Sequence, residues 1–213
     1  KVSGVLLVLL LIAVTTFMVS CKKKEEEPEV VKIGASVSLS GNLARFGNMV
    51  KSGYELWAEQ VNAEGGIDVG GKKLPVEIVY YDDQSDNQTS AKLTEKLITE
   101  DKVQFLLGPF GSGPTFATTA IAEKYNIITM ATLANATNIY DRGFQNVFAV
   151  LAPATRIFAS FIDMLAAQKP RPSKVAIIYP NDNFPGAVAK GAEAYAKEKG
   201  FEVVYIEEYT KGV

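Results

Sequence analysis

The sequence predicts an α/β protein built on parallel strands that are covered by helices on both faces. Three observations predict this class. Short apolar, β-rich segments alternate along the chain with longer segments whose apolar residues recur at helical spacing. Glycine pairs, prolines and acidic residues separate these segments. The composition is also that of an ordinary globular chain, with 47% hydrophobic and 22% charged residues among 213. Regular alternation of this kind favours parallel sheets.

Residues 1–30 have a different character from the rest of the chain. Lys1 precedes an apolar run that extends to residue 19 and is followed by Ser20 and Cys21. The run is short for a membrane span, which needs about 20 apolar residues, so we expect a signal peptide at 1–20. A lone cysteine at this position resembles a bacterial lipobox, in which the peptide is cleaved before Cys21 and the thiol receives a lipid. The alternative is an anchor helix with an incidental cysteine.

Residues 21–30 are expected to form a charged tether behind that anchor. Three lysines, three glutamates and a proline follow Cys21 in order. Such blocks of charge cannot pack a core, so this segment is expected to hold the folded part away from the membrane surface.

The folded part begins near residue 31 and alternates strand with helix to its end. Strands are expected at 31–38, 75–81, 103–107, 127–130, 147–151, 174–179 and 202–207. Helices are expected around 50–61, at 86–101, around 116–125, at 155–168 and around 188–195.

Particular residues support individual helices. Val50, Tyr54, Trp57 and Val61 recur at steps of four, three and four, which places them on one helical face, and a glycine pair at 65–66 follows. Asp86 is a plausible cap for the second helix, with Leu93, Leu97 and Ile98 facing inward. In the helix at 155–168 we expect Ile157, Phe161, Met164 and Leu165 to cluster on one face.

The composition excludes several functions. The 22 basic residues do not exceed the 24 acidic ones, so a nucleic-acid partner is not expected. The chain has no histidine, which removes the commonest general base and metal ligand. Its single cysteine excludes an internal disulfide and a cysteine zinc cluster. We therefore expect a protein without a cofactor, without a metal and without catalytic activity.

Two carboxylates, Asp82 and Asp83, stand at the end of an expected strand. Paired carboxylates can act as acid and base, but no nucleophile or histidine accompanies this pair, so a strand-end turn is the preferred interpretation. Ligands of parallel sheets gather at the carboxyl ends of the strands. The loops expected to matter are therefore 39–47, 108–115, 131–137 and 180–185.

Several motifs follow one another in a recognisable order. They are Ser38-Leu39-Ser40-Gly41, Val61-Asn62-Ala63-Glu64-Gly65-Gly66-Ile67, Tyr80-Tyr81-Asp82-Asp83, Leu107-Gly108-Pro109 leading to Ser112, and Lys174-Val175-Ala176-Ile177-Ile178-Tyr179. Together they resemble the periplasmic solute-binding proteins of the branched-chain amino acid ABC transporter type.

The resemblance implies the type I periplasmic binding fold, with two α/β lobes joined by crossover strands and a ligand cleft between them. The first lobe would span 31–151 and the second would begin at 152. The family is nearly twice as long, so the second lobe would be incomplete at residue 213 and a returning segment would lie beyond it. We expect the 213-residue piece alone to bind ligand weakly or not at all.

The resemblance also implies a set of ligand contacts. Ser112, which follows Gly111 at a strand–helix junction, would bind a carboxylate, although it or Gly113 could simply cap the helix. The loop with Leu133, Ala134 and Asn135 would bind an ammonium group, although asparagine also forms turns. Phe46 and Phe184, at positions where tyrosine is common, would cover the ligand from the two lobes or pack between them. An acidic partner for the ammonium would lie beyond residue 213.

The implied function is that of an extracytoplasmic substrate-binding lipoprotein of an ABC importer. It would act as a monomer in the periplasm or at the cell surface, capture an amino acid or a related carboxylate, and deliver it to an ABC permease. The alternative is the ligand-sensing ectodomain of a signalling receptor with the same fold. A small α/β enzyme is a third possibility that the missing catalytic motifs disfavour.

Overall fold

A computed structural model describes residues 30–210, so the expected signal peptide, the tether and Cys21 lie outside the described residues. Five parallel strands form one sheet in the order β4-β1-β5-β6-β7. These strands are β1 (Val31–Val37), β4 (Val76–Asp82), β5 (Phe105–Leu107), β6 (Ile128–Ala131) and β7 (Val147–Ala149). The helices that connect them are α2 (Ala44–Ala63), α3 (Asn87–Thr99) and α4 (Ser112–Lys124). We call this unit the first lobe.

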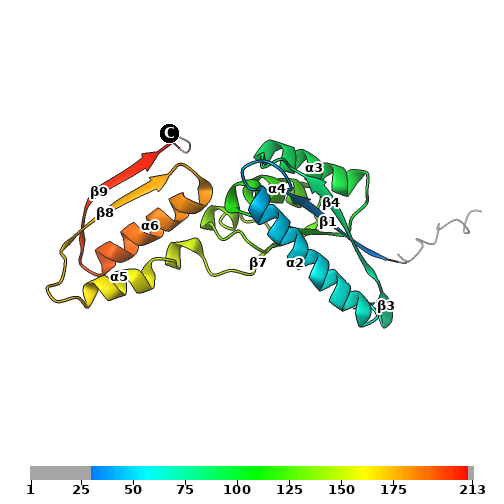
Figure 1. Cartoon of the computed structure of the whole chain (residues 1–213), viewed down its shortest axis with the longest axis horizontal. Coiled ribbons are helices and arrows are strands. Elements are labelled where there is room, and N and C mark those ends of the chain that lie inside the picture. The colour runs from blue at the N-terminus through cyan, green and yellow to red at the C-terminus, as the bar shows by residue number, and fades with distance from the viewer. Residues whose placement is uncertain (1–29, 211–213) are drawn as a thin grey trace, which may run out of the picture.

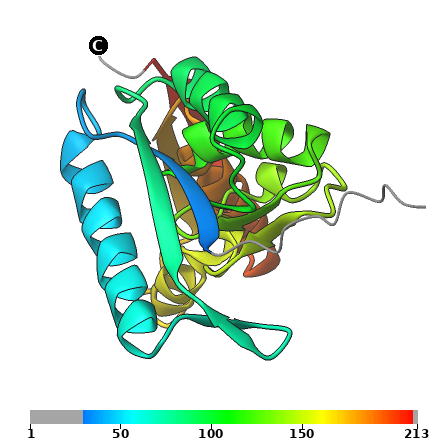
Figure 2. The ribbon, with the colours of Figure 1, turned by 90° about the vertical axis from the view of Figure 1, so that its right-hand side faces the viewer.

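The helices cover opposite faces of this sheet (Figure 2). Side chains alternate between the two faces of a strand. Val31 and Ile33 of β1 belong to a buried cluster against α2, whereas Leu106 of β5 packs with Leu97 of α3 on the other face. This arrangement confirms the predicted class, a parallel sheet flanked by helices.

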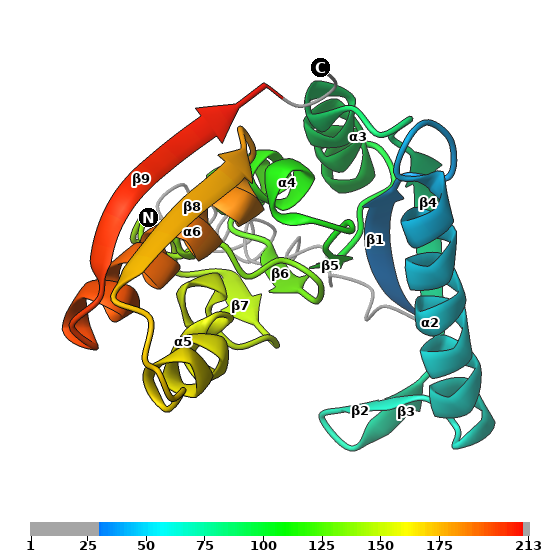
Figure 3. The same ribbon diagram turned by 60° about the vertical axis from the view of Figure 1, so that its left-hand side comes forward.

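A small hairpin extends the first lobe beyond the end of α2 (Figure 3). It consists of β2 (Ile67–Val69) and β3 (Lys72–Leu74), which are antiparallel. The glycine pair at 70–71 forms its turn, and both glycines have positive φ.

A second, smaller unit follows, which we call the second lobe (Figure 1). It contains a parallel strand pair, β8 (Lys174–Pro180) and β9 (Glu202–Tyr209). The 3₁₀ helix η2 (Ala154–Arg156) leads into α5 (Ala159–Ala166), and α6 (Asn183–Glu198) connects the two strands. Its buried core consists of Ile162, Ala192, Ala196 and Phe201.

Small side chains join the two lobes. Ala134 and Ala136 of the first lobe are completely buried in one cluster with Ala154 of η2 and Ala187 of α6. The short 3₁₀ helix η1 (Thr137–Ile139) contributes Ile139 to the same cluster. Because these residues are small, the backbones of the two lobes approach each other closely.

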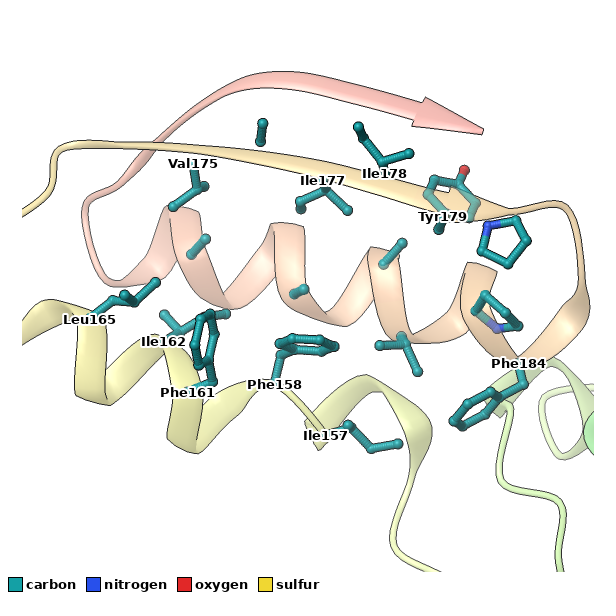
Figure 4. A pocket seen from close by; sticks show the side chains of 17 residues that line it. Ile157, Phe158, Phe161, Ile162, Leu165, Val175, Ile177, Ile178, Tyr179 and Phe184 are labelled. Atoms are coloured by element: carbon teal, nitrogen blue, oxygen red, sulfur yellow. The ribbon is translucent and has the colours of Figure 1, made fainter. Parts of the chain in front are cut away.

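Of the four residues expected on one face of a helix at 155–168, Ile157, Phe161 and Leu165 do line the same groove, but the single continuous helix is wrong. The segment is divided into η2 and α5, and its buried residue is Ile162. Ile157, Phe161 and Met164 are each 48% exposed. They are exposed because β8 and β9 are the only strands of this lobe among the described residues. Ile157 and Phe161 line an open apolar groove of about 380 Å³ between α5, α6 and β8 (Figure 4).

The helical face predicted around Tyr54 is correct only in part. Val50 and Tyr54 are buried under the sheet, but Trp57 is 38% exposed. At the end of α2 nearer the hairpin, Ala58 and Val61 make the contact with the buried cluster.

Candidate ligand-binding cleft

A cleft of about 460 Å³ lies at the carboxyl ends of the first-lobe strands, where the second lobe approaches them. This volume suits a small molecule. The residues that line it are Leu43, Phe110, Gly111, Ser112, Gly113, Pro114, Leu133, Asn135, Leu151, Ile157, Asp182, Phe184 and Pro185. Each of the four loops predicted from the topology contributes at least one of them.

The strand order explains why the cleft lies there. β1 pairs with β4 on one side and with β5 on the other, so the order along the sheet reverses at β1. The connections that leave β1 and β5 enter α2 and α4, which cover opposite faces. A crevice opens between such connections at the carboxyl edge of the sheet.

Ser112 is the first residue of α4 and is only 2% exposed. Gly111 precedes it with φ at +92°, a conformation that favours glycine, and offers no side-chain cap to the helix. The Ser112 hydroxyl accepts a hydrogen bond from the Ala136 N–H at 3.2 Å and keeps its own proton to donate. This donor, together with the positive end of α4, can bind a carboxylate.

The two loops that carry the site are paired like short extensions of the sheet. Gly108 N–H donates to the Met130 carbonyl at 2.9 Å, and Phe110 forms a parallel bridge with Leu133. The Leu133 carbonyl, expected to face an ammonium group, accepts from Gly111 N–H at 3.2 Å. A carbonyl has a second lone pair, so this bond leaves a further acceptor position.

Tyr54 of α2 contacts both loops, the one that begins at Gly108 and the one that contains Thr132. Its hydroxyl donates to the Gly108 carbonyl at 2.6 Å and also contacts the Thr132 hydroxyl. Burial raises the pKa of Tyr54 to about 12, although the hydrogen bond with Thr132 acts in the opposite direction. A helix on one face thus holds the strand ends that lead into the site.

Asn135 forms two hydrogen bonds with the segment at 152–154, which leads from the first lobe into the second. Its side-chain Nδ2 donates to the Ala152 carbonyl at 2.8 Å, and its backbone carbonyl accepts from Ala154 N–H, also at 2.8 Å. The amide nitrogen is therefore engaged, and Oδ1 is the atom suited to meet a donor from a ligand. Ala134 beside it is completely buried, so its side chain lies beneath the cleft and not in the wall.

Aromatic rings approach the cleft from both lobes. Phe184, at the start of α6, lines it from the second lobe. Phe46 stacks on Phe110, with ring centroids 4.5 Å apart and planes inclined by 7°. Of these two rings Phe110 lines the cleft, whereas Phe46 is outside the lining and 41% exposed.

Sequence reasoning missed several cleft residues, including Phe110, Ile157 and Asp182. Phe110 lies inside a loop that the topology already indicated, and its aromatic side chain among three glycines within six positions was an available signal. Asp182 caps α6 by accepting from Asn183 N–H at 2.7 Å. Asp182 lies in the loop expected at 180–185, where an acidic residue is a candidate cap for a helix that begins earlier than expected.

The carboxylate pair at the end of β4 forms a turn, as the preferred interpretation predicted. Asp82 accepts hydrogen bonds from the N–H groups of Leu39 and Ser40 and from the Ser40 hydroxyl. Desolvation opposes ionisation, but these bonds hold the pKa of Asp82 below its ordinary value. Asp83 is fully buried and accepts from the Ser38 hydroxyl at 2.6 Å.

Residues 30–210 contain neither a metal-ligand cluster nor a membrane-spanning helix. No group of three or more acidic or cysteine side chains is arranged there to hold a metal ion. Within the same residues, no helix combines the length and the apolar character needed to cross a membrane.

A family match and the curated relatives both identify this chain with periplasmic binding proteins. Residues 30–213 match the family described as "Periplasmic binding protein". Leu/Ile/Val-binding protein homolog 7 of Brucella abortus is 30% identical over 187 residues, which cover 84% of this chain and 45% of the relative. The chain thus spans about half the length of the curated relatives it matches.

Solved structures share the fold over a similar extent. The substrate-binding protein LivJ of Streptococcus pneumoniae, a branched-chain amino acid transporter component solved with isoleucine, is 26% identical with a TM-score of 0.69. The alignment covers 86% of this chain and 51% of LivJ. A solute-binding protein from R. palustris solved with 4-hydroxybenzoate is 22% identical, with a TM-score of 0.72 over 86% of this chain and 48% of that one. The second likeness establishes the fold alone.

Proposed function

Because this chain belongs to the periplasmic binding protein family, we propose that it forms the ligand-capturing part of an extracytoplasmic substrate-binding lipoprotein of an ABC importer. The first lobe spans residues 31–151 and the second begins at 152. They hold a small amino acid or a related carboxylate between them and deliver it to an ABC permease. Catalysis is not part of this function, and the relatives and solved neighbours carry the names of binding proteins.

The observation that carries the proposal is the composition of the cleft. Ser112 and the start of α4 offer hydrogen-bond donors at one place, while Phe110, Leu133 and Phe184 provide apolar walls from both lobes. Binding sites for small molecules combine few polar groups with predominantly apolar walls in this way. A ligand whose carboxylate lies at Ser112 and whose aliphatic or aromatic group lies against the walls matches both the hydrogen-bond donors and the apolar walls.

Export and lipidation at Cys21 complete the proposal. They place the cleft in the periplasm or at the cell surface, attached to a membrane by an N-terminal lipid. Cells that express the gene with Cys21 intact should incorporate a radiolabelled fatty acid into the protein, and Cys21→Ser should abolish the label. A label that persists in the variant would contradict lipidation at this residue.

A thermal-shift screen tests ligand binding. The sample is the gene product from Lys22 to its encoded C-terminus, and the panel contains aliphatic and aromatic amino acids, their amides and short-chain or aromatic carboxylates. A ligand present at about a hundredfold its Kd should stabilise the protein by about 2.7 kcal/mol. Stabilisation by an amino acid or a carboxylate is expected. No stabilisation by either class would overturn the proposed ligand class.

A further inference from the structure

We propose that the exposed face of α2 binds the same face of a second copy of this chain, so that two first lobes pair through antiparallel helices. The inference goes beyond the proposed function, because it concerns a surface outside the ligand cleft and does not depend on the ligand. The family resemblance implies a monomer, whereas the exposed face of α2 favours a pair.

Large apolar side chains on α2 are open to solvent. Met49 is 65% exposed, Leu56 is 56% exposed, and Trp57 beside it is 38% exposed. Met49 and Leu56 are about two helical turns apart, so they lie on the same face of the helix. Figure 2 shows α2 on the outer side of the first lobe. Exposed apolar side chains that gather on one face are typical of a contact surface between proteins.

The spacing along this face allows it to contact a copy of itself. In an antiparallel pair with a twofold axis between Ser52 and Gly53, each residue before the axis faces the equivalent residue after it. Met49 of each copy then faces Leu56 of the other. A Cβ built on Gly53 would have no atom of another element of the described chain within 4 Å. Because Ser52 and Gly53 are small, the two helices can approach closely where they cross.

The charges on this face have the same symmetry. Arg45 lies about one turn before Met49, and both are exposed. Glu59, also exposed, lies about one turn after Leu56. In the antiparallel pair Arg45 of each copy meets Glu59 of the other, whereas a parallel pair would place like charges together. Within residues 30–210 neither side chain takes part in an ion pair, so both can bind a second copy. Charge therefore favours the antiparallel arrangement.

Analytical ultracentrifugation tests the proposal with the gene product from Lys22 to its encoded C-terminus, which lacks the proposed lipid anchor. We expect the mass to reach that of two chains by about 100 μM. Leu56→Lys places a charge in the apolar centre of the contact and should raise the dissociation constant of the pair at least about tenfold. A mass of one chain at every concentration, or an unchanged constant in Leu56→Lys, would overturn the proposal.

Charge reversal tests the antiparallel arrangement. Arg45→Glu and Glu59→Arg each place like charges opposite one another, so each variant should weaken the pair at least about tenfold. The double variant, with both substitutions in one chain, has the net charge of the wild type and again joins opposite charges. It should regain most of the lost affinity. A double variant as weak as the two single variants would overturn the contact between Arg45 and Glu59.

Lys92→Glu is the control variant. Lys92 is exposed on α3, which covers the other face of the sheet, and its reversal changes the net charge by the same amount as Arg45→Glu. It should leave the association unchanged, and circular dichroism confirms that all the variants are folded. Equal weakening by Lys92→Glu and Arg45→Glu would mean that net charge governs the association, and this outcome would overturn the role of the α2 face.

Discussion

Ser112 has a structural hydrogen bond and a proposed role in ligand binding at the same hydroxyl. Its hydroxyl accepts from the buried N–H of Ala136, which fixes the loop after β6 to the start of α4. The same hydroxyl keeps a proton for an acceptor in the cleft. The sequence placed Ser112 at a strand–helix junction, but the contact with Ala136 depends on two segments that meet only in the folded chain.

We predict that Ser112→Ala weakens binding of a carboxylate ligand by about 1–3 kcal/mol, because a charged acceptor loses its hydroxyl donor. Calorimetric titration of the panel's best ligand measures the change. Ser90→Ala serves as control, since Ser90 is fully buried against Ser36 and lies outside the cleft lining. An unchanged Kd in Ser112→Ala would remove this residue from the site. The unliganded variants also need their unfolding free energies compared, because Ala136 N–H loses its acceptor.

Tyr54 should make the stability of the protein sensitive to alkaline pH. Burial raises its pKa from about 10 to about 12, so between these values the folded state keeps a proton that the unfolded state has lost. The unfolding free energy should therefore fall across this window, by about 2–3 kcal/mol from this residue, and the contribution is fully present below pH 10. Comparing denaturant unfolding of the wild type and Tyr54→Phe from pH 9 to 12 isolates the effect. Parallel pH profiles would contradict it.

At the scale of elements, local patterns predicted what each segment forms better than what it packs against. Every expected strand is present, and Asp86 caps α3 through Thr89 as predicted. In the segment at 155–168, apolar spacing identified a shared face, but it showed neither which partner covers that face nor that the segment is divided into η2 and α5. Ile157 and Phe161 lie on the open groove, whereas Ile162 packs on α6 and β8.

In the candidate site too, the position of each loop was predictable from the sequence, whereas the contacts between loops were not. Loop positions were predictable from the parallel topology, since strand ends meet at one edge whatever their side chains are. The pairing of Phe46 with Phe110 was not predictable, because the two residues lie 64 positions apart. The contact of Asp182 with the region of Gly113 also depends on how the two lobes meet.

We predict that Asn135→Ala loosens the connection between the lobes. The side chain holds the Ala152 carbonyl, and its loss removes a neutral hydrogen bond of about 0.5–1.5 kcal/mol. Small-angle X-ray scattering should show a larger radius of gyration without ligand, and affinity should fall by up to about tenfold. In Asn48→Ala, which loses a bond to Ala44 within α2, neither quantity should change. Identical scattering from Asn135→Ala and the wild type would contradict the prediction.

At the scale of the whole molecule, the two lobes are unequally built in the described residues. The first has a five-stranded sheet, whereas the second has a two-stranded one. Ile178, Tyr205 and Tyr209 of the second sheet are between 48% and 65% exposed. Two strands alone are marginally stable, so the second lobe should be the less protected unit.

A polypeptide of residues 22–213 should therefore have two lobes of unequal stability. We expect its second-lobe amides to exchange hydrogen faster than those of the first lobe, and we expect it to bind the panel's ligands weakly or not at all. Hydrogen-exchange mass spectrometry and calorimetry measure both. Uniform protection together with tight, stoichiometric binding would show that these residues form a sufficient cleft.

The most direct test of the central claim is a crystal structure of the gene product with the panel's best ligand. The account predicts that the ligand lies between the lobes, with its carboxylate at Ser112 and the start of α4 and its apolar part between Phe110 and Phe184. A ligand bound elsewhere, or bound without contact to loop 108–115, would contradict it.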